Sequence, residues 1–241
     1  MKLQFKHQKF QADAAKAVVD VFAGQPYLTP TYMMDRGYQG KTVDGLEFAQ
    51  SSISEEVDFT GWRNERIVPE LSDKLILEHL QKVQRTNQIK PSDKLEGRYN
   101  LTIEMETGVG KTYTYIKTMY ELNARYGWSK FVIVVPSIAI REGVFKSFES
   151  MAEHFAGEYG KRMQYFIYNS KQLAKIDAFA SDNGIHAMII NTQAFASSLK
   201  EDGRSKEARI IYSKRDEFGS RRPIDVIKAN RPIIILDEPT A

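Results

Sequence analysis

One short segment constrains the fold of this chain more than any other. It reads Met105-Glu-Thr-Gly-Val-Gly-Lys-Thr112 and stands between two regular patterns. Apolar and polar residues alternate over residues 99–105, as in a β-strand, whereas residues 111–126 have helical spacing. A strand that passes through a glycine-rich turn directly into a helix is typical of phosphate-binding loops, because glycine permits the backbone angles and the helix presents the positive end of its dipole.

Each residue of this loop has an expected part in holding ATP. Backbone N–H groups would turn toward the phosphates from Thr107, Gly108, Val109 and Gly110. Lys111 would place its charge on the β- and γ-phosphates and assist catalysis, and the Thr112 hydroxyl would ligate Mg²⁺. The general pattern has glycine six positions before the lysine, where this chain has Met105. The alternative interpretation is a glycine-rich turn that binds nothing.

A second segment supplies the carboxylates that such a site needs. It reads Ile233-Ile-Ile-Leu-Asp-Glu238, four large apolar residues followed by two acids. The apolar run predicts a buried strand, and ligands of parallel sheets bind at the carboxyl ends of strands. We expect Asp237 to belong to the magnesium shell and Glu238 to act as the base or orienter of the attacking water. Acidic residues also merely end strands, so this segment predicts a hydrolytic site only together with the glycine loop.

The remaining patterns predict the fold class. Strands alternate with helices along the chain, which indicates an α/β fold with a mostly parallel sheet and helices on both faces. The run Phe131-Val-Ile-Val-Val135 is continuous and apolar, as expected of a strand buried on both faces. Further strands are expected at residues 164–168, 187–190 and 232–236. Further helices are expected at residues 10–22, around residues 71–83, and after Ser137.

We expect a single lobe over residues 1–241. Within it, residues 1–26 form a helical start, residues 27–95 an insertion, and residues 96–241 the core that carries the glycine loop. No helix follows the last expected strand, so the core is expected to be truncated after the Asp-Glu pair and incomplete at its carboxyl end.

Composition narrows the class of protein. Hydrophobic residues make up 42% of the chain and charged residues 27%, as in ordinary globular domains. No stretch reaches the roughly 18–20 apolar residues of a membrane-spanning helix, and residues 1–10 lack the apolar core of a secretory signal. The absence of cysteine excludes disulfides, thiolate zinc sites and a cysteine nucleophile, and it fits a cytoplasmic protein. The net charge of +3 permits a polyanionic partner without requiring one.

Two further segments carry a family resemblance. The first begins at the end of the apolar run and reads Val134-Val-Pro-Ser-Ile-Ala-Ile-Arg-Glu-Gly-Val144. The second begins at the end of the strand expected at residues 187–190 and reads Ile189-Ile-Asn-Thr-Gln-Ala-Phe195. With the glycine loop and the Asp-Glu pair, they resemble motifs in the amino-terminal part of the restriction subunit of type III restriction–modification enzymes, a family of superfamily 2 helicase-type ATPases. In that family the position of Met105 is not required to be glycine. Thr240 departs from the family's usual glutamine, which couples the nucleotide site to later motifs.

The resemblance implies a RecA-like P-loop NTPase lobe that binds Mg-ATP and DNA. Gln11, preceded by Phe10, is similar to the family's glutamine motif and would contact the adenine edge. Ser137, Arg141 and Thr192 would contact the nucleic-acid backbone, since a motor must step along any sequence. The implied partners are DNA, a second motor lobe, a nuclease domain and a methyltransferase (modification) subunit. Because arginine from a second lobe speeds phosphoryl transfer by about 10³–10⁵, we expect this chain alone to hydrolyse ATP slowly.

Two other functions stay open on the residues alone. A kinase or GTPase would share the loop, but the chain has no guanine-reading Asn/Thr-Lys-x-Asp segment, and the Asp-Glu pair favours hydrolysis by water. A non-enzymatic, nucleotide-responsive lobe for DNA binding or assembly would share the fold and differ only in turnover. The basic stretch at residues 204–222 is interpreted as a solvated loop rather than a DNA contact, because acidic residues are interleaved with it.

Overall fold

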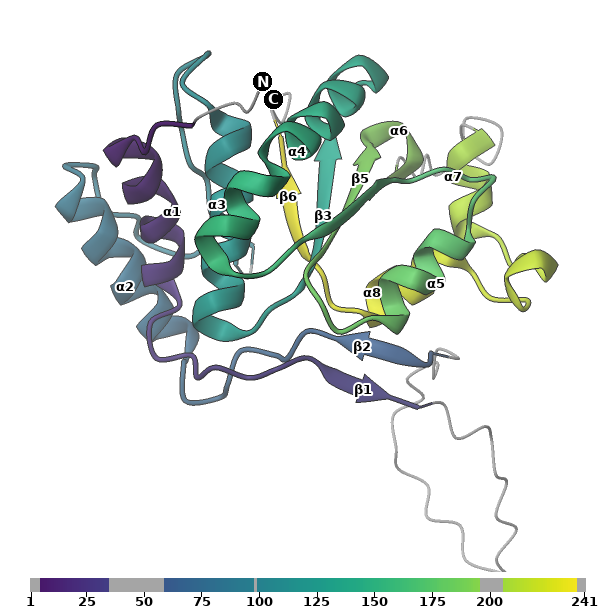
Figure 1. Ribbon diagram of the computed structural model, residues 1–241. Coiled ribbons are helices and arrows are strands. Elements are labelled where there is room, and N and C mark those ends of the chain that lie inside the picture. The colour runs from purple at the N-terminus through teal and green to yellow at the C-terminus, as the bar shows by residue number, and fades with distance from the viewer. Residues whose placement is uncertain (1–4, 35–58, 98, 196–205, 238–241) are drawn as a thin grey trace, which may run out of the picture.

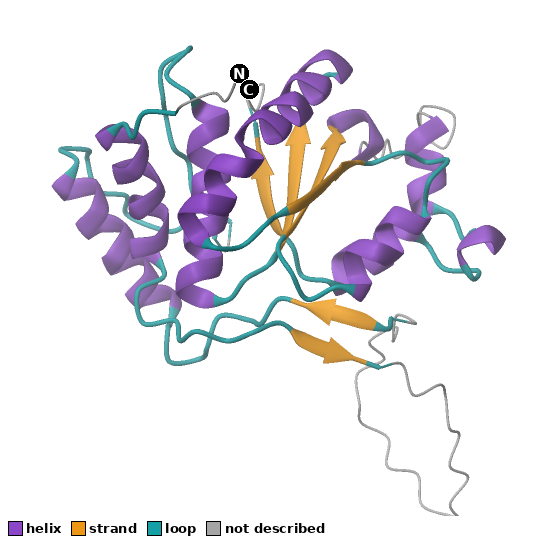
Figure 2. Cartoon of the chain, in the orientation of Figure 1, coloured by secondary structure: helices purple, strands orange, loops and turns teal. Residues whose placement is uncertain are grey.

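The structure, a computed structural model, describes residues 5–34, 59–97, 99–195 and 206–237. A sheet of parallel strands lies between layers of helices, with a small antiparallel hairpin beside the amino ends of the strands (Figures 1 and 2). This arrangement confirms the predicted α/β class. The strands are β1 (Thr31–Met33), β2 (Gly61–Arg63), β3 (Lys130–Val135), β4 (Gln164–Ile167), β5 (His186–Asn191) and β6 (Ile233–Leu236). The helices are α1 (Lys9–Val21), α2 (Asp73–Thr86), α3 (Lys111–Tyr126), α4 (Ile138–Tyr159), α5 (Ala174–Ser181), α6 (Thr192–Phe195), α7 (Lys206–Tyr212) and α8 (Pro223–Ala229).

The parallel sheet has the order β4-β5-β3-β6. In its register, Val135 of β3 lies opposite Asn191 of β5, and Val134 lies opposite Leu236 of β6. The carboxyl ends of these three strands therefore reach the same edge of the sheet. Residues that follow them in the sequence are brought together there, although they are 50 to 100 positions apart.

The two faces of β3 explain its uninterrupted apolar sequence. Phe131, Ile133 and Val135 face a core cluster shared with α1, α3 and α4, whereas Val132 and Val134 face a second cluster shared with α5, α7 and α8. Every side chain of this strand is consequently buried, as in other sheets covered on both sides. The helices that cover it are amphipathic, and none in the described part of the chain is both long and apolar enough to cross a membrane.

The strand predicted for residues 99–105 is wrong. Residues 101–106 form no strand, and Tyr99 and Leu101 pack instead against the helical cluster of α1 and α2. A strand needs a hydrogen-bonding neighbour, and among the described strands β6 pairs only with β3. On β6, Ile234 and Leu236 are 58% and 59% exposed. Residues 101–106 therefore lead to the glycine loop without belonging to a regular element.

Asn64, directly after β2, connects the hairpin to the sheet. Its Oδ1 accepts hydrogen bonds from the backbone N–H groups of Ser129 and Lys130 at 2.8 and 3.0 Å. Its Nδ2 donates to the carbonyl oxygens of Lys130 and Arg231 at 2.9 and 3.0 Å. The side chain is 2% exposed. One asparagine thus satisfies backbone groups at the amino ends of both β3 and β6, where the ladders begin.

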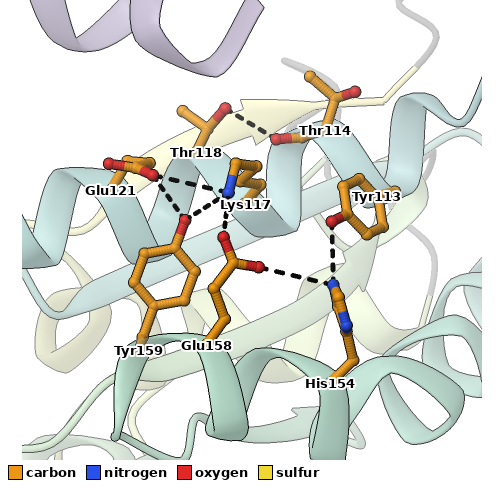
Figure 3. A network of polar contacts seen from close by, with 8 residues as sticks. All are labelled: Tyr113, Thr114, Lys117, Thr118, Glu121, His154, Glu158 and Tyr159. Carbon is orange, nitrogen blue, oxygen red and sulfur yellow. Dashed lines mark hydrogen bonds and ion pairs between the residues drawn. The ribbon is translucent and has the colours of Figure 1, made fainter. Parts of the chain in front are cut away.

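The α3–α4 interface contains a buried polar network (Figure 3). Lys117 Nζ contacts Glu158 Oε1 at 2.5 Å and the Tyr159 hydroxyl at 2.8 Å, and its side chain is 9% exposed. At the other end of the network, the Tyr113 hydroxyl lies 3.0 Å from His154 Nε2. Burial lowers the pKa of His154, which favours its neutral form. The network holds the helix after the glycine loop against the helix after β3.

We predict that Asn64→Ala lowers the free energy of unfolding by about 3 kcal/mol, because it removes three buried hydrogen bonds and one partly buried hydrogen bond to the backbone. Urea titration followed by circular dichroism measures the change. The control is Asn87→Ala, since Asn87 is exposed and donates only to the carbonyl of Val83. Equal losses in the two variants would contradict the central role of Asn64.

We predict that Glu158→Ala costs about 2–3 kcal/mol of stability, because Lys117 then stays buried with only Glu121, at 3.7 Å, to balance its charge. The same titration of Glu153→Ala is the matched control. Glu153 is also on α4, but its ion pair with Arg162 is exposed on both sides and should contribute less than about 0.5 kcal/mol. A cost for Glu158→Ala as small as that of the control would show that Lys117 needs no carboxylate at this interface.

Candidate nucleotide and nucleic-acid site

The glycine loop lies at the amino end of α3. Gly110 is the N-cap residue of the helix with a φ of 91°, and Gly108 has a φ of 83°. Both angles fall in the left-handed region that favours glycine. A Cβ at Gly108 would meet no atom within 4 Å, so the loop faces open space. The first turn of α3 carries no acidic side chain to offset the positive end of its dipole. An anion such as a phosphate fits this cradle.

Gln11 of α1 contacts the loop directly. Its Nε2 donates to the carbonyl oxygen of Val109 at 2.8 Å, across 98 positions of sequence. The side chain is 8% exposed, and a Cβ at Gly110 would lie 2.5 Å from the same nitrogen. The second glycine of the loop therefore makes room for Gln11. The contact of Gln11 with adenine stays a prediction. Its hydrogen bond to the loop is a finding that the sequence did not suggest.

Asp237 reaches the same place from β6. Its backbone N–H donates to Val134 at 2.9 Å and so continues the β3–β6 ladder by one residue. Its Oδ2 accepts a hydrogen bond from the Tyr115 hydroxyl of α3 at 3.2 Å. The structure therefore brings the first acid of the pair to α3, the helix that follows the glycine loop, at Tyr115. Glu238 lies outside the described residues, and its role as base stays a prediction.

Tyr115 is a residue that the sequence analysis missed. Burial raises the pKa of its hydroxyl far above the usual value, and the charge of Asp237 raises it further. The Thr112 hydroxyl has a smaller opposing influence through hydrogen bonding. A tyrosine within a helix gives no signal by itself. The available clue was its position three residues after Thr112, which places both side chains on one face of the helix.

Few carboxylates surround this point. Within the described ranges, no three His, Cys, Asp or Glu side chains gather into a group that could cage a metal ion. Mg²⁺ commonly uses one or two protein ligands together with phosphate oxygens and water. A pair such as Thr112 and Asp237 fits that kind of site better than it fits an all-protein cage.

The predicted nucleic-acid contacts lie along the same edge of the sheet. Ser137 caps α4, with its Oγ accepting from the N–H of Ile140 at 3.2 Å. Thr192 Oγ1 lies 3.5 Å from the carbonyl oxygen of Pro136, so the loops after β3 and β5 are adjacent. Arg141 lies one turn further along α4; its side chain is 15% exposed and pairs with Glu142 at 3.3 Å. The structure groups Ser137 with Thr192, and it places the Arg141 guanidinium largely inside the protein.

Asn191, the last residue of β5, was also missed. It is 1% exposed, and neither polar atom of its amide has a hydrogen-bonding partner. A buried amide without partners carries a desolvation cost, so such residues concentrate where a ligand or a second conformation supplies the missing bonds. The clue in the sequence was a polar residue that ends an apolar strand directly before Thr192.

We predict that Gly110→Ala destabilises the protein more than Gly108→Ala. Both variants incur the left-handed penalty of about 1–2 kcal/mol, but only the first drives a methyl group into Gln11. In a Gln11→Ala background the excess should disappear. Denaturant titration of the parent, the two glycine variants, Gln11→Ala and the two double variants tests this, and an excess that persists without the Gln11 side chain would show that the contact does not shape the loop.

Most of the chain is similar in sequence to one family of known proteins. Residues 65–239 match the family described as "Type III restriction enzyme, res subunit". The chain is 30% identical over 188 residues to the Res subunit of the type III restriction–modification enzyme EcoP15I from Escherichia coli, covering 70% of this chain and 19% of that protein. It is 29% identical to the EcoPI Res subunit of Escherichia phage P1, again over 188 residues that cover 70% of this chain and 19% of that protein.

A third relative is the StyLTI Res subunit of Salmonella typhimurium, 29% identical over 165 residues, which cover 61% of this chain and 16% of the relative. The chain therefore spans about a fifth of the length of the relatives it matches. The family match extends over most of the chain, from just after β2 to the Asp-Glu pair. This chain belongs to the family of type III restriction enzyme Res subunits.

Proposed function

We propose that this chain is the ATP-binding first motor lobe of a DNA-dependent ATPase of the type III restriction kind. The observation that carries the proposal is the contact between Asp237 and Tyr115, because it brings the end of β6 to the helix that follows the glycine loop, across 122 positions of sequence. A phosphate cradle and a carboxylate at one point are the minimum for binding a nucleotide with Mg²⁺. Membership of the Res-subunit family supports a helicase-type ATPase.

The residues of the site have separate roles in this proposal. Lys111 neutralises charge on the β- and γ-phosphates, and the loop N–H groups from Thr107 to Gly110 bind their oxygens. Thr112 and Asp237 would hold Mg²⁺, which offsets the negative charge of the phosphates when it is bound. Glu238 orients the attacking water or takes its proton. Gln11 contacts the adenine edge with the part of its amide that does not bond to Val109.

The nucleic-acid role rests on the adjacent loops after β3 and β5. Ser137 and Thr192 present hydroxyl groups at the amino end of α4, where the helix dipole favours phosphate. Arg141 would turn outward from its pair with Glu142 to reach a DNA backbone. We propose that hydrolysis at full rate, and cleavage of DNA, depend on a second motor lobe, a nuclease domain and a modification subunit, because the relatives are Res subunits of restriction–modification enzymes and the matched segment covers only 19% of their length.

We predict that saturating Mg-ATP raises the thermal unfolding midpoint of the chain and that Lys111→Ala abolishes the rise. At about one hundred times Kd a bound ligand adds about 2.7 kcal/mol, which for this size corresponds to roughly 5–10 °C. Differential scanning fluorimetry measures it. The control is Lys82→Ala, an exposed lysine on α2 that should keep the parent shift.

The nucleotide series separates the competing functions. A larger shift with GTP than with ATP would favour a different P-loop enzyme. A shift without any DNA-stimulated turnover, even after a second lobe is supplied, would favour a nucleotide-responsive assembly lobe. No shift in a folded sample would mean that the loop has the motif without the site.

A further inference from the structure

Tyr115 joins the two side chains that are proposed to hold magnesium. Its hydroxyl donates to Asp237 Oδ2 at 3.2 Å. Thr112 is three residues earlier on the same face of α3, and its hydroxyl lowers the pKa of the phenol in the manner of a hydrogen-bond donor. The tyrosine hydroxyl therefore lies between the first turn of α3 and the end of β6, two elements that are far apart in the sequence.

The position of this hydroxyl is fixed by the packing around it. The Tyr115 ring is half-buried and lies against the core cluster shared by α3, α4 and the sheet. The next residue of the helix, Ile116, is 2% exposed and anchors the same turn in that core. Because packing restricts the movement of the ring, its hydroxyl stays in one place and can orient the side chains that bond to it.

The hydrogen-bonding capacities of the three groups are complementary. A threonine hydroxyl that offers an oxygen lone pair to a cation still has a hydrogen that needs an acceptor. The phenol oxygen would accept that hydrogen, and its own hydroxyl hydrogen is donated to the Asp237 carboxylate. A chain from Thr112 through Tyr115 to Asp237 would determine which lone pairs of the first and last groups face the cation.

We propose that Tyr115 is a positioning residue that orients the Thr112 hydroxyl and the Asp237 carboxylate toward one Mg²⁺. The role rests on the proposed nucleotide function, since it concerns the same site. It predicts a specific defect: without the phenol hydroxyl, the protein should lose affinity for the metal complex of the nucleotide and keep its affinity for the nucleotide itself.

The test compares the affinities of the whole chain for Mg-ATP and for ATP in EDTA by isothermal titration calorimetry. The ratio of the two affinities is the metal enhancement. Tyr115→Phe keeps the ring and removes the hydroxyl, and it should lower the enhancement about five- to tenfold, the value of one or two hydrogen bonds. Its affinity for metal-free ATP should stay within about twofold of the parent.

Tyr113→Phe is the matched control. Tyr113 is on the same helix two residues earlier, but its hydroxyl contacts His154 at the α4 interface. The control should keep the parent enhancement. A Tyr115→Phe protein with the parent enhancement, or with both affinities lowered alike, would overturn the positioning role. A parent chain whose affinity for ATP is not raised by Mg²⁺ would contradict the proposed function instead.

Variants of Thr112 test the same site from the hydroxyl that Tyr115 is proposed to orient. Thr112→Ser retains a hydroxyl that can bind the cation and donate to the phenol, so it should keep most of the enhancement. Thr112→Val removes that hydroxyl and should lose it. Where both tyrosine and threonine variants fold, their double variant should lose less than the sum of the single losses, because they act through one chain of hydrogen bonds. Additive losses would count against that chain.

Discussion

The pairing of β3 on both of its edges is the constraint on which this site depends. β5 and β6 are aligned to the same central strand, and both ladders start where Asn64 satisfies the backbone. The carboxyl ends consequently arrive together, and Asp237 continues the β6 ladder before its side chain turns to α3. A shift of β6 by one residue would reverse its faces and carry this carboxylate away from the glycine loop.

Helix α3 connects the parts that the sheet edge brings together. Its first turns carry Lys111, Thr112 and Tyr115, and its middle carries Lys117 of the α3–α4 network. Its carboxyl end closes at Gly127, whose φ of 80° and close approach to the Leu28 carbonyl both require glycine. The helix is thus fixed at both ends and along one side. A helix held in this way can present the Thr112 hydroxyl and the Lys111 ammonium group to a ligand, and it need not become ordered when the ligand binds.

Sequence patterns predicted the helices and strands whose formation depends on local chemistry and on burial. The helix expected over residues 111–126 has those bounds, and the apolar runs at β3 and β6 are strands as expected. The pattern failed at residues 99–105, because alternation indicates an extended backbone but does not supply a neighbouring strand. Asn64 and Tyr115 could not be predicted either. Each acts through partners more than sixty positions away, and a single polar residue carries no periodicity that would reveal them.

The two halves of the site are supported unequally, and this follows from their positions in the fold. The cradle is held by α1 through Gln11, by the core beneath α3 and by the network with α4. Asp237 extends from β6, which pairs on one side among the described strands and leaves Ile234 and Leu236 mostly exposed. Elements with few buried contacts open at lower free energy than the core. The Tyr115 hydroxyl ties this less supported carboxylate to the better supported helix, so its importance should be greatest for the metal-binding half.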